Sequence, residues 1–228
     1  MTIEFSSETT YRLARCALAA SNDPQRQNLH HVVIFPDGLI AATDGKIVAL
    51  SRVANQCETA FIPPGDPILI PASLFNSAKL WRPKVDKRDA GQLAEPEFPR
   101  LLFSVDLDAG KATLGPAGGP WTTAEASIGS YPNVRGVFPR HPQQCAKAVT
   151  INPEQQIIAA RILAVQPGYL GRPWSDGPGK AQFYASKSGH CLVGLSPLIL
   201  TGEGVDKLPA AFAFVLGSPA PVESAPAA

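Results

Sequence analysis

The chain has 228 residues, of which 45% are hydrophobic and 17% are charged, and its formal net charge is +1. This composition is that of a globular protein and excludes a largely disordered chain. The near-neutral charge excludes a general field that attracts nucleic acid, so any DNA contact must come from a local arrangement of Lys and Arg.

The first predicted unit is a strand followed by a helix and three strands. Alternating apolar residues predict the opening strand at 3–5, and the helix is expected over 8–20. Three extended segments follow, at 29–35, 39–43 and 46–53. Between the last two lies Asp44-Gly45, which predicts a tight hairpin because both central residues of such a turn take positive φ.

The same order of elements occurs twice more. A strand at 68–70 leads into a helix at 74–82 that Pro83 ends. A strand at 149–151 leads into a third helix, with Asn152 as its cap and Pro153 at its first position. The strands expected after these helices are 101–106, 111–114, 122–127, 181–185, 191–195 and 211–216. Three similar copies predict an α+β repeat architecture, with chance likeness among β-α segments as the alternative.

Two segments resemble bacterial sliding clamps, the DNA polymerase III beta subunits. The hairpin Ala42-Thr43-Asp44-Gly45 is followed by a basic residue and two aliphatic ones, and the stretch 130–139 resembles the linker between the clamp's last two domains. The match covers residues 1 to about 165. It implies DNA-clamp-like repeats, with helices packed on one face of antiparallel sheets and lining a hole for DNA.

The resemblance implies a division into domains. Residues 1–145 are expected to form a complete clamp-like domain with its interdomain linker, and 146–217 a partial one. Residues 218–228 are rich in Pro and Ala and predict a disordered tail. No equivalent of the clamp's first domain is recognised, and Gly217-Ser218-Pro219 stands where the family carries a terminal pocket-lining string.

Basic residues on or just after the three helices are the expected DNA contacts. They are Arg12, Arg15, Lys79, Arg82, Lys84 and Arg161. If the helices face duplex DNA, these side chains neutralise phosphates without reading bases. The alternative interpretation is an ordinary solvated helix face.

The family also has an apolar groove that takes a short peptide from polymerases and other clamp-binding proteins. The matching positions are Leu29, Thr43, Gly45, Lys46, Val48, Pro139, Val215 and Leu216. Lys46-Ile47 stands where the family has a His-Arg pair. Ordinary packing of the hairpin is the alternative.

The sequence predicts no catalytic residues, cofactor or metal. His30 and His31 are neighbours on a predicted strand and point to opposite faces. The stretch 115–120 is Gly-rich but has no Lys-Ser/Thr end, and 194–197 lacks the closing Gly of a nucleophile elbow. The four cysteines are widely spaced, which favours reduced thiols.

The expected function is that of a sliding-clamp-like, non-enzymatic processivity factor. It would act as a homo-oligomer, because a closed ring needs several copies. The first ten residues have no apolar signal region and no run approaches the roughly 20 residues of a membrane span, which predicts a cytoplasmic protein. Two alternatives stay open: an interaction module that binds partner peptides without encircling DNA, and a small enzyme with an unrecognised site.

Overall fold

The computed structural model describes residues 1–76, 101–137, 143–144, 152–163, 170, 173–175, 181–186 and 191–196. Met1–Pro197 forms one compact unit. The predicted strands 149–151 and 211–216, the predicted domain boundary after residue 145 and the predicted tail lie outside the described residues. The division into a complete and a partial domain therefore stays a prediction.

The described elements follow the order strand, helix, strands that the sequence predicts. The helices are α1 (Ser7–Ala17), α2 (Gln56–Thr59), α3 (Ser73–Asn76) and α4 (Pro153–Leu163), with 3-10 turns η1 (Gln27–Leu29) and η3 (Val134–Val137). The strands are β1 (Thr2–Phe5), β2 (His31–Ile34), β3 (Leu39–Thr43), β4 (Ile47–Arg52), β5 (Ile68–Pro71), β6 (Leu101–Asp106), β7 (Lys111–Pro116), β8 (Thr122–Glu125), β9 (Ser127–Ile128), β10 (Gln143–Gln144), β11 (Trp174–Ser175), β12 (Gln182–Ala185) and β13 (Cys191–Leu195).

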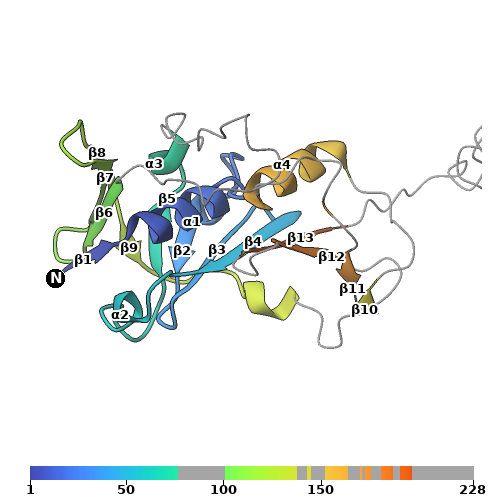
Figure 1. Ribbon diagram of the computed structural model, residues 1–228, viewed down its shortest axis with the longest axis horizontal. Coiled ribbons are helices and arrows are strands. Elements are labelled where there is room, and N and C mark those ends of the chain that lie inside the picture. The colour runs from blue at the N-terminus through green and yellow to red at the C-terminus, as the bar shows by residue number, and fades with distance from the viewer. Residues whose placement is uncertain are drawn as a thin grey trace, which may run out of the picture. The chain divides into compact units, whose positions relative to one another are not determined.

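These strands form two antiparallel sheets, as Figure 1 shows. Within the described residues, one sheet has the order β1-β6-β7-β8 and the other β10-β11-β12-β13-β4-β3-β2-β5-β9. The larger sheet is continuous because β13 pairs with β4, which joins strands from the first and third sequence units. The α+β class with helices on antiparallel sheets is confirmed.

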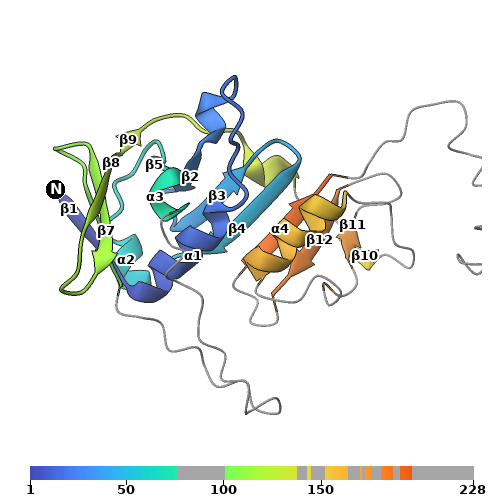
Figure 2. The same ribbon diagram turned by 90° about the horizontal axis from the view of Figure 1, so that it is seen from above.

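Helices α1 and α4 lie side by side on one face of the larger sheet (Figure 2). In α1, Ser6 caps the first turn by accepting a hydrogen bond from the Thr9 amide, and Leu13 and Cys16 are fully buried. In α4, Ala159 and Ile162 are buried against the sheet. Burial of these apolar side chains holds both helices on the sheet.

The opposite face of the larger sheet carries a second apolar cluster. Successive side chains of a strand point to opposite faces, so each strand contributes to both clusters. The members of this second cluster are Val33, Ala41, Val48, Leu50, Leu69, Val134 and Phe183. Val134 belongs to η3, the yellow turn that lies below the sheet in Figure 1, opposite α1 and α4. The sheet is therefore covered by helices on one face and by the linker around η3 on the other.

The β3–β4 hairpin turns at Gly45-Lys46, so the prediction of a two-residue turn at Asp44-Gly45 is wrong by one residue. The Asp44 amide donates to the Ile47 carbonyl at 3.3 Å across this turn. Thr43 pairs with Val48, and Gly45 takes the positive φ of 88°. The Asp44 carboxylate accepts hydrogen bonds from the amides of both Lys46 and Ile47, at 2.7 Å each. These bonds hold Lys46 in the turn and out of the ladder.

The predicted strand at 122–127 is also divided. Residues 122–125 form β8 in the smaller sheet, whereas 127–128 form β9, which pairs with β5 in the larger one. Ala126 lies between them and donates its amide hydrogen to the Gly110 carbonyl. The chain changes sheets at this residue, which alternation of apolar residues does not reveal.

A buried carboxylate fixes the start of α1. Glu58 of α2 is 7% exposed and accepts hydrogen bonds from the Ser6 amide at 2.9 Å and the Thr9 hydroxyl at 2.5 Å. The Thr9 hydroxyl in turn accepts the Ala54 amide at 2.8 Å. A negative group at the N-terminus of a helix also stabilises the helix dipole.

Replacement of Glu58 by Ala is expected to lower the free energy of unfolding by about 2 kcal/mol, because the buried Thr9 hydroxyl and the part-buried Ser6 amide lose their acceptor. Urea unfolding followed by circular dichroism measures this loss. Glu125→Ala is the matched control, since Glu125 is exposed on β8. Equal stabilities for the two variants would contradict a structural role for Glu58.

Candidate functional site

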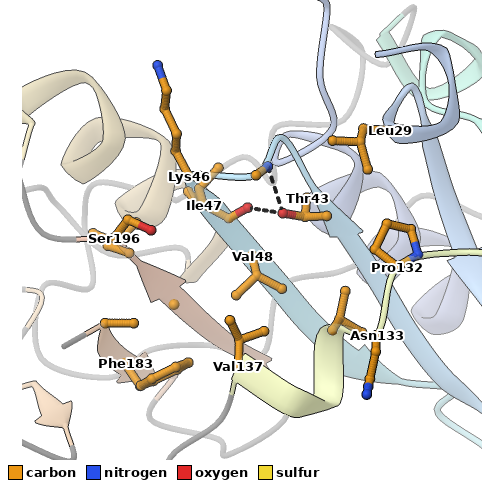
Figure 3. A pocket seen from close by; sticks show the side chains of 15 residues that line it. Leu29, Thr43, Lys46, Ile47, Val48, Pro132, Asn133, Val137, Phe183 and Ser196 are labelled. Carbon is orange, nitrogen blue, oxygen red and sulfur yellow. Dashed lines mark hydrogen bonds between the residues drawn. The ribbon is translucent and has the colours of Figure 1, made fainter.

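An apolar pocket of about 230 Å³ opens on the sheet face that η3 covers (Figure 3). Its walls come from the β3–β4 hairpin, the ends of β12 and β13, and the linker 132–137. The lining residues are Leu29, Thr43, Gly45, Lys46, Ile47, Val48, Pro132, Asn133, Val134, Val137, Ala181, Phe183, Gly194, Leu195 and Ser196. The pocket therefore lies on the side of the sheet away from α1 and α4.

The hairpin wall is held rigidly by Thr43. Its hydroxyl donates to the Ile47 carbonyl at 2.6 Å and accepts the Gly45 amide at 3.0 Å, as Figure 3 shows. The Lys46 carbonyl accepts the Ser196 amide at 2.8 Å, which ties the turn to the end of β13. The Lys46 side chain extends away from the pocket floor (Figure 3).

The linker wall is tied to the sheet by Tyr131. Its phenolic oxygen accepts the Thr43 amide hydrogen at 3.1 Å and donates to the His31 carbonyl at 3.3 Å. Beyond it, Val134 is 2% exposed and anchors η3, whereas Val137 is 50% exposed at the pocket rim. An ion pair of 2.7 Å between Arg135 and Asp37 holds the same turn from outside.

Burial shifts the titration of the groups beneath the linker. Burial raises the pKa of Tyr131 well above its usual value and lowers the pKa of His31. The Nδ1 atom of His31 is buried and has no hydrogen-bond partner among the described residues. Both side chains are therefore neutral at pH 7.

Replacement of Tyr131 by Phe is expected to lower the free energy of unfolding by about 1–2 kcal/mol at pH 7, because the Thr43 amide loses its acceptor. The variant should also change the alkaline limb of the pH profile. A raised folded-state pKa gives stability that is complete below the unfolded-state value of about 10 and is lost as pH rises above it.

Urea unfolding at several pH values between 7 and 11 tests both effects. The wild type should lose more stability above about pH 10 than the variant. Burial also raises the pKa of Cys16, but Cys16 is present in both proteins and cancels in the difference. Parallel profiles for wild type and variant would show that Tyr131 does not carry the alkaline loss.

Five of the eight predicted groove residues line this pocket: Leu29, Thr43, Gly45, Lys46 and Val48. Pro139, Val215 and Leu216 lie outside the described residues. The sequence interpretation missed the pocket residues from η3, β12 and β13. Strand alternation could have placed Phe183 and Gly194 on a sheet face, but only the pairing of β13 with β4 brings them beside the hairpin.

The predicted DNA-contact residues that the structure describes differ in how far they are exposed to solvent. Lys79, Arg82 and Lys84 lie outside the described residues. Arg161 is exposed on α4 and belongs to none of the ion pairs found within the described residues. The Arg15 guanidinium lies 4.1 Å from the centre of the Tyr11 ring and donates to the Tyr11 hydroxyl, so its side chain is half-buried.

Arg12 departs from the expected exposed position. It is only 7% exposed, and its guanidinium donates to the Arg52 carbonyl at 2.9 Å and to the Glu8 carboxylate at 2.5 Å. The physical reason is tertiary: the end of β4 brings a carbonyl beside α1, and Glu8 lies one turn earlier. The side chain is satisfied within the protein and does not face outward as a phosphate contact.

The described residues contain no group of three or more His, Cys, Asp or Glu side chains that could hold a metal ion. None of their helices is both long enough and apolar enough to cross a membrane.

No family model matches the chain, and no curated protein matches its sequence. Its structure is similar to sliding clamps, the DNA polymerase III beta subunits. The clamp of Bartonella birtlesii, 11% identical, superposes with a TM-score of 0.58 over 87% of this chain and 66% of that one. The Caulobacter crescentus clamp, 13% identical, superposes with a TM-score of 0.58 over 87% of this chain and 65% of that one. The beta subunit of Pseudomonas aeruginosa, 14% identical, superposes with a TM-score of 0.56 over 87% of this chain and 66% of that one.

The resemblance read from the hairpin and the linker is thus confirmed at the level of the fold. The first-named clamps are longer than this chain, which spans about 66% of their length. The chain has the fold of the bacterial sliding clamps.

Proposed function

We propose that this protein is a sliding-clamp-like, non-enzymatic replication factor that recruits partner proteins through a short peptide bound in the pocket. The observation that carries the proposal is the pocket itself. Residues expected from the clamp resemblance come together with η3, β12 and β13 around one apolar hollow. Such a role is cytoplasmic, where polymerase or other clamp-binding proteins are the partners.

The size and lining of the pocket suit peptide side chains. Its volume of about 230 Å³ is below the roughly 300–1,000 Å³ of typical small-molecule sites, which favours one or two side chains of a larger partner. The described lining is mainly aliphatic with Phe183 as its one aromatic ring. Peptide motifs of this kind bind through a few apolar anchors placed in a groove.

The proposed DNA contact is on the other side of the sheet. Arg15 on α1, half-buried beside Tyr11, and Arg161 on α4, exposed, belong to two helices that pack against each other. Contacts of this type are independent of base sequence and sensitive to salt. Retention on DNA further requires a closed ring of several copies.

Peptide selection tests the recruitment proposal. A library of random heptapeptides displayed on phage is selected on the whole protein, and the enriched sequence is synthesised with fluorescein. Fluorescence anisotropy should give a dissociation constant in the micromolar range, and binding should protect the pocket side of the sheet from hydrogen exchange. Failure to enrich any peptide, or protection confined to the α1–α4 side, would contradict recruitment through this pocket.

A second candidate function is an interaction module that does not encircle DNA. The charges of the helix face favour it: Glu8 and Glu154 are exposed on the same helices as Arg15 and Arg161. Apolar side chains are exposed there too, with Leu18 at 40% and Ile157 at 43%. Helices α1 and α4 together therefore carry a net charge of only +1, from Arg12, Arg15 and Arg161 against Glu8 and Glu154.

Light scattering with plasmid DNA separates the two functions. A ring-forming clamp should show an oligomer mass and should stay on a circular plasmid at high salt but slip off the linearised plasmid. An interaction module should run as a monomer and leave both forms of DNA at the same salt concentration.

A further inference from the structure

We propose that the free edge of β8 binds an extended, basic segment of a partner protein, which adds to the four-stranded smaller sheet as a fifth strand. No residue of β8 lines the pocket, and β8 is separate from α1 and α4. Binding at this edge is therefore a further interaction, which does not depend on peptide recruitment through the pocket. Two features of β8 carry the proposal: its pairing pattern and the side chains beside its edge.

The backbone of β8 is open on one side. Within the described residues β8 is an outer strand of the smaller sheet and pairs only with β7 (Figure 1). The Ala126 amide donates to the Gly110 carbonyl at 2.8 Å, one step beyond the pair of Lys111 with Glu125. In an antiparallel ladder, hydrogen-bonded pairs alternate with pairs that are not bonded. The amides and carbonyls of Thr123 and Glu125 therefore point away from β7, toward the free edge.

This edge lacks the usual protection against another strand. Exposed edge strands are commonly guarded by Pro, Lys or a bulge. Residues 122–125 read Thr-Thr-Ala-Glu and pair with β7 in an unbroken register, so β8 has none of these guards. The side chains of Thr122, Thr123 and Glu125 are exposed. A partner strand can therefore reach the outward backbone groups and exchange hydrogen bonds with them.

Trp121 and Leu102 form the apolar end of the edge. The register of the sheet places Trp121 beside Gly115, which pairs with Leu102 on its other side. A Cβ atom on Gly115 would lie 3.1 Å from Cδ2 and Cε3 of Trp121, so the indole ring lies over the glycine. Trp121 is 50% exposed and Leu102 is 47% exposed. An apolar side chain of an added strand would cover this surface.

Glu125 gives the other end of the edge a negative charge. Its neighbour across the ladder is Lys111 of β7, which pairs in turn with Asp106 of β6. Charge thus alternates in sign from β6 to β8, and a cation on the next strand would continue the row. Glu125 is exposed and belongs to none of the ion pairs found within the described residues. A second copy of β8 would not supply this cation, because positions 121 to 128 contain no Lys or Arg.

Strand alternation sets the sequence of the partner. Trp121, Thr123 and Glu125 share one face of the sheet because they are two residues apart. An antiparallel partner needs Lys or Arg opposite Glu125, then a β-branched residue opposite Thr123, then a large apolar residue opposite Trp121. Each of these lies two positions after the one before, so the partner pattern is basic-x-β-branched-x-apolar.

The probe is an end-blocked synthetic peptide of this pattern, Ser-Lys-Ser-Val-Thr-Leu-Ser, called the edge peptide. It is added to the whole protein at millimolar concentration, and amide hydrogen exchange is followed by nuclear magnetic resonance. Exchange at Thr123 and Glu125 should slow in proportion to the fraction of protein bound. Exchange at Ala124 and Ala126, whose amides already face β7, should change little. Protection of alternate residues is expected of strand addition and not of a ligand that only covers side chains.

Two variants separate backbone pairing from charge. Thr123→Pro removes an outward amide hydrogen without removing a bond to β7, and it should weaken the edge peptide about tenfold. Its matched control, Thr123→Val, keeps the amide and should bind as the wild type does. Glu125→Lys should weaken the edge peptide about fivefold and strengthen by a similar factor the same peptide with Glu in place of Lys. Thermal unfolding shows whether each variant is folded.

Alternate protection together with the reversed charge preference of Glu125→Lys supports the proposal. Unchanged exchange at Thr123 and Glu125, or equal affinity of the wild type for the Lys and Glu peptides, overturns it. Protection of these two amides in the free protein that grows with protein concentration also overturns it, since the edge then pairs with a second copy. None of these results bears on the pocket, which is tested by the peptide selected on the whole protein.

Discussion

Replacement of Val137 by Asp is expected to weaken binding of the selected heptapeptide at least tenfold without unfolding the protein. Val137 is 50% exposed on η3 and forms part of the pocket lining, so the fold does not depend on burying it. A carboxylate at this rim removes apolar contact area and must be desolvated when the peptide closes over it. Fluorescence anisotropy gives the affinity, and thermal unfolding gives the stability.

Ile128→Asp is the matched control for this variant. Ile128 is a β-branched residue with 52% exposure, like Val137, but it lies on β9 and is not part of the pocket lining. The change in charge is the same in both variants. Equal weakening by both changes would show that the peptide responds to the net charge of the protein and not to the pocket.

Replacement of Arg15 and Arg161 by Ala together is expected to lower affinity for a 30-base-pair duplex about tenfold at low salt. Each phosphate contact releases counterions, so the slope of log affinity against log salt should fall by about 0.9 per residue, or about two for the pair. The two side chains are on neighbouring helices of the same sheet face. Anisotropy titrations at four salt concentrations between 50 and 200 mM measure both quantities.

The matched control for the DNA variant removes two cations from other elements. Lys111 on β7 and Arg52 at the end of β4 are both exposed and are not on α1 or α4. Their joint replacement by Ala changes the net charge by the same amount. If that control lowers affinity and salt slope as much as the helix variant does, DNA is attracted by overall charge and the helix face has no special role.

Local chemistry was enough to predict many of the elements. Strands at 39–43, 101–106 and 191–195 match β3, β6 and β13 residue for residue, because each is a short run of strand-forming residues between turns. The Asn152-Pro153 signal correctly marks the start of α4. These features depend on residues close together in the chain.

Features that depend on long-range pairing could not be predicted in the same way. The floor of the pocket needs β13 beside β4, and these strands are separated by more than 100 residues. The burial of Arg12 needs the Arg52 carbonyl at the end of β4. The split of 122–127 between two sheets needs the partners of both halves. In each case the local sequence predicts the face of the strand or helix on which a side chain lies, or its charge, but does not predict which distant residues surround it.

The pocket and the α1–α4 surface lie on opposite faces of the larger sheet. The pocket uses Val48 and the outer side of the hairpin, whereas α1 and α4 cover Ala49 on the other side. Adjacent residues of a single strand thus serve opposite faces. The two proposed sites do not overlap, so the proposal requires that a partner peptide and duplex DNA bind at the same time without competing.

A nuclear magnetic resonance titration tests this two-faced arrangement most directly. Amide spectra of the 24.1 kDa chain are recorded with the selected heptapeptide, with a 30-base-pair duplex, and with both together. The account predicts that the peptide shifts the signals of Val48, Val137 and Gly194, that the duplex shifts those of Arg15 and Arg161, and that the two sets add. Overlapping shifts, displacement of one ligand by the other, or no response of α1 and α4 to the duplex would contradict it.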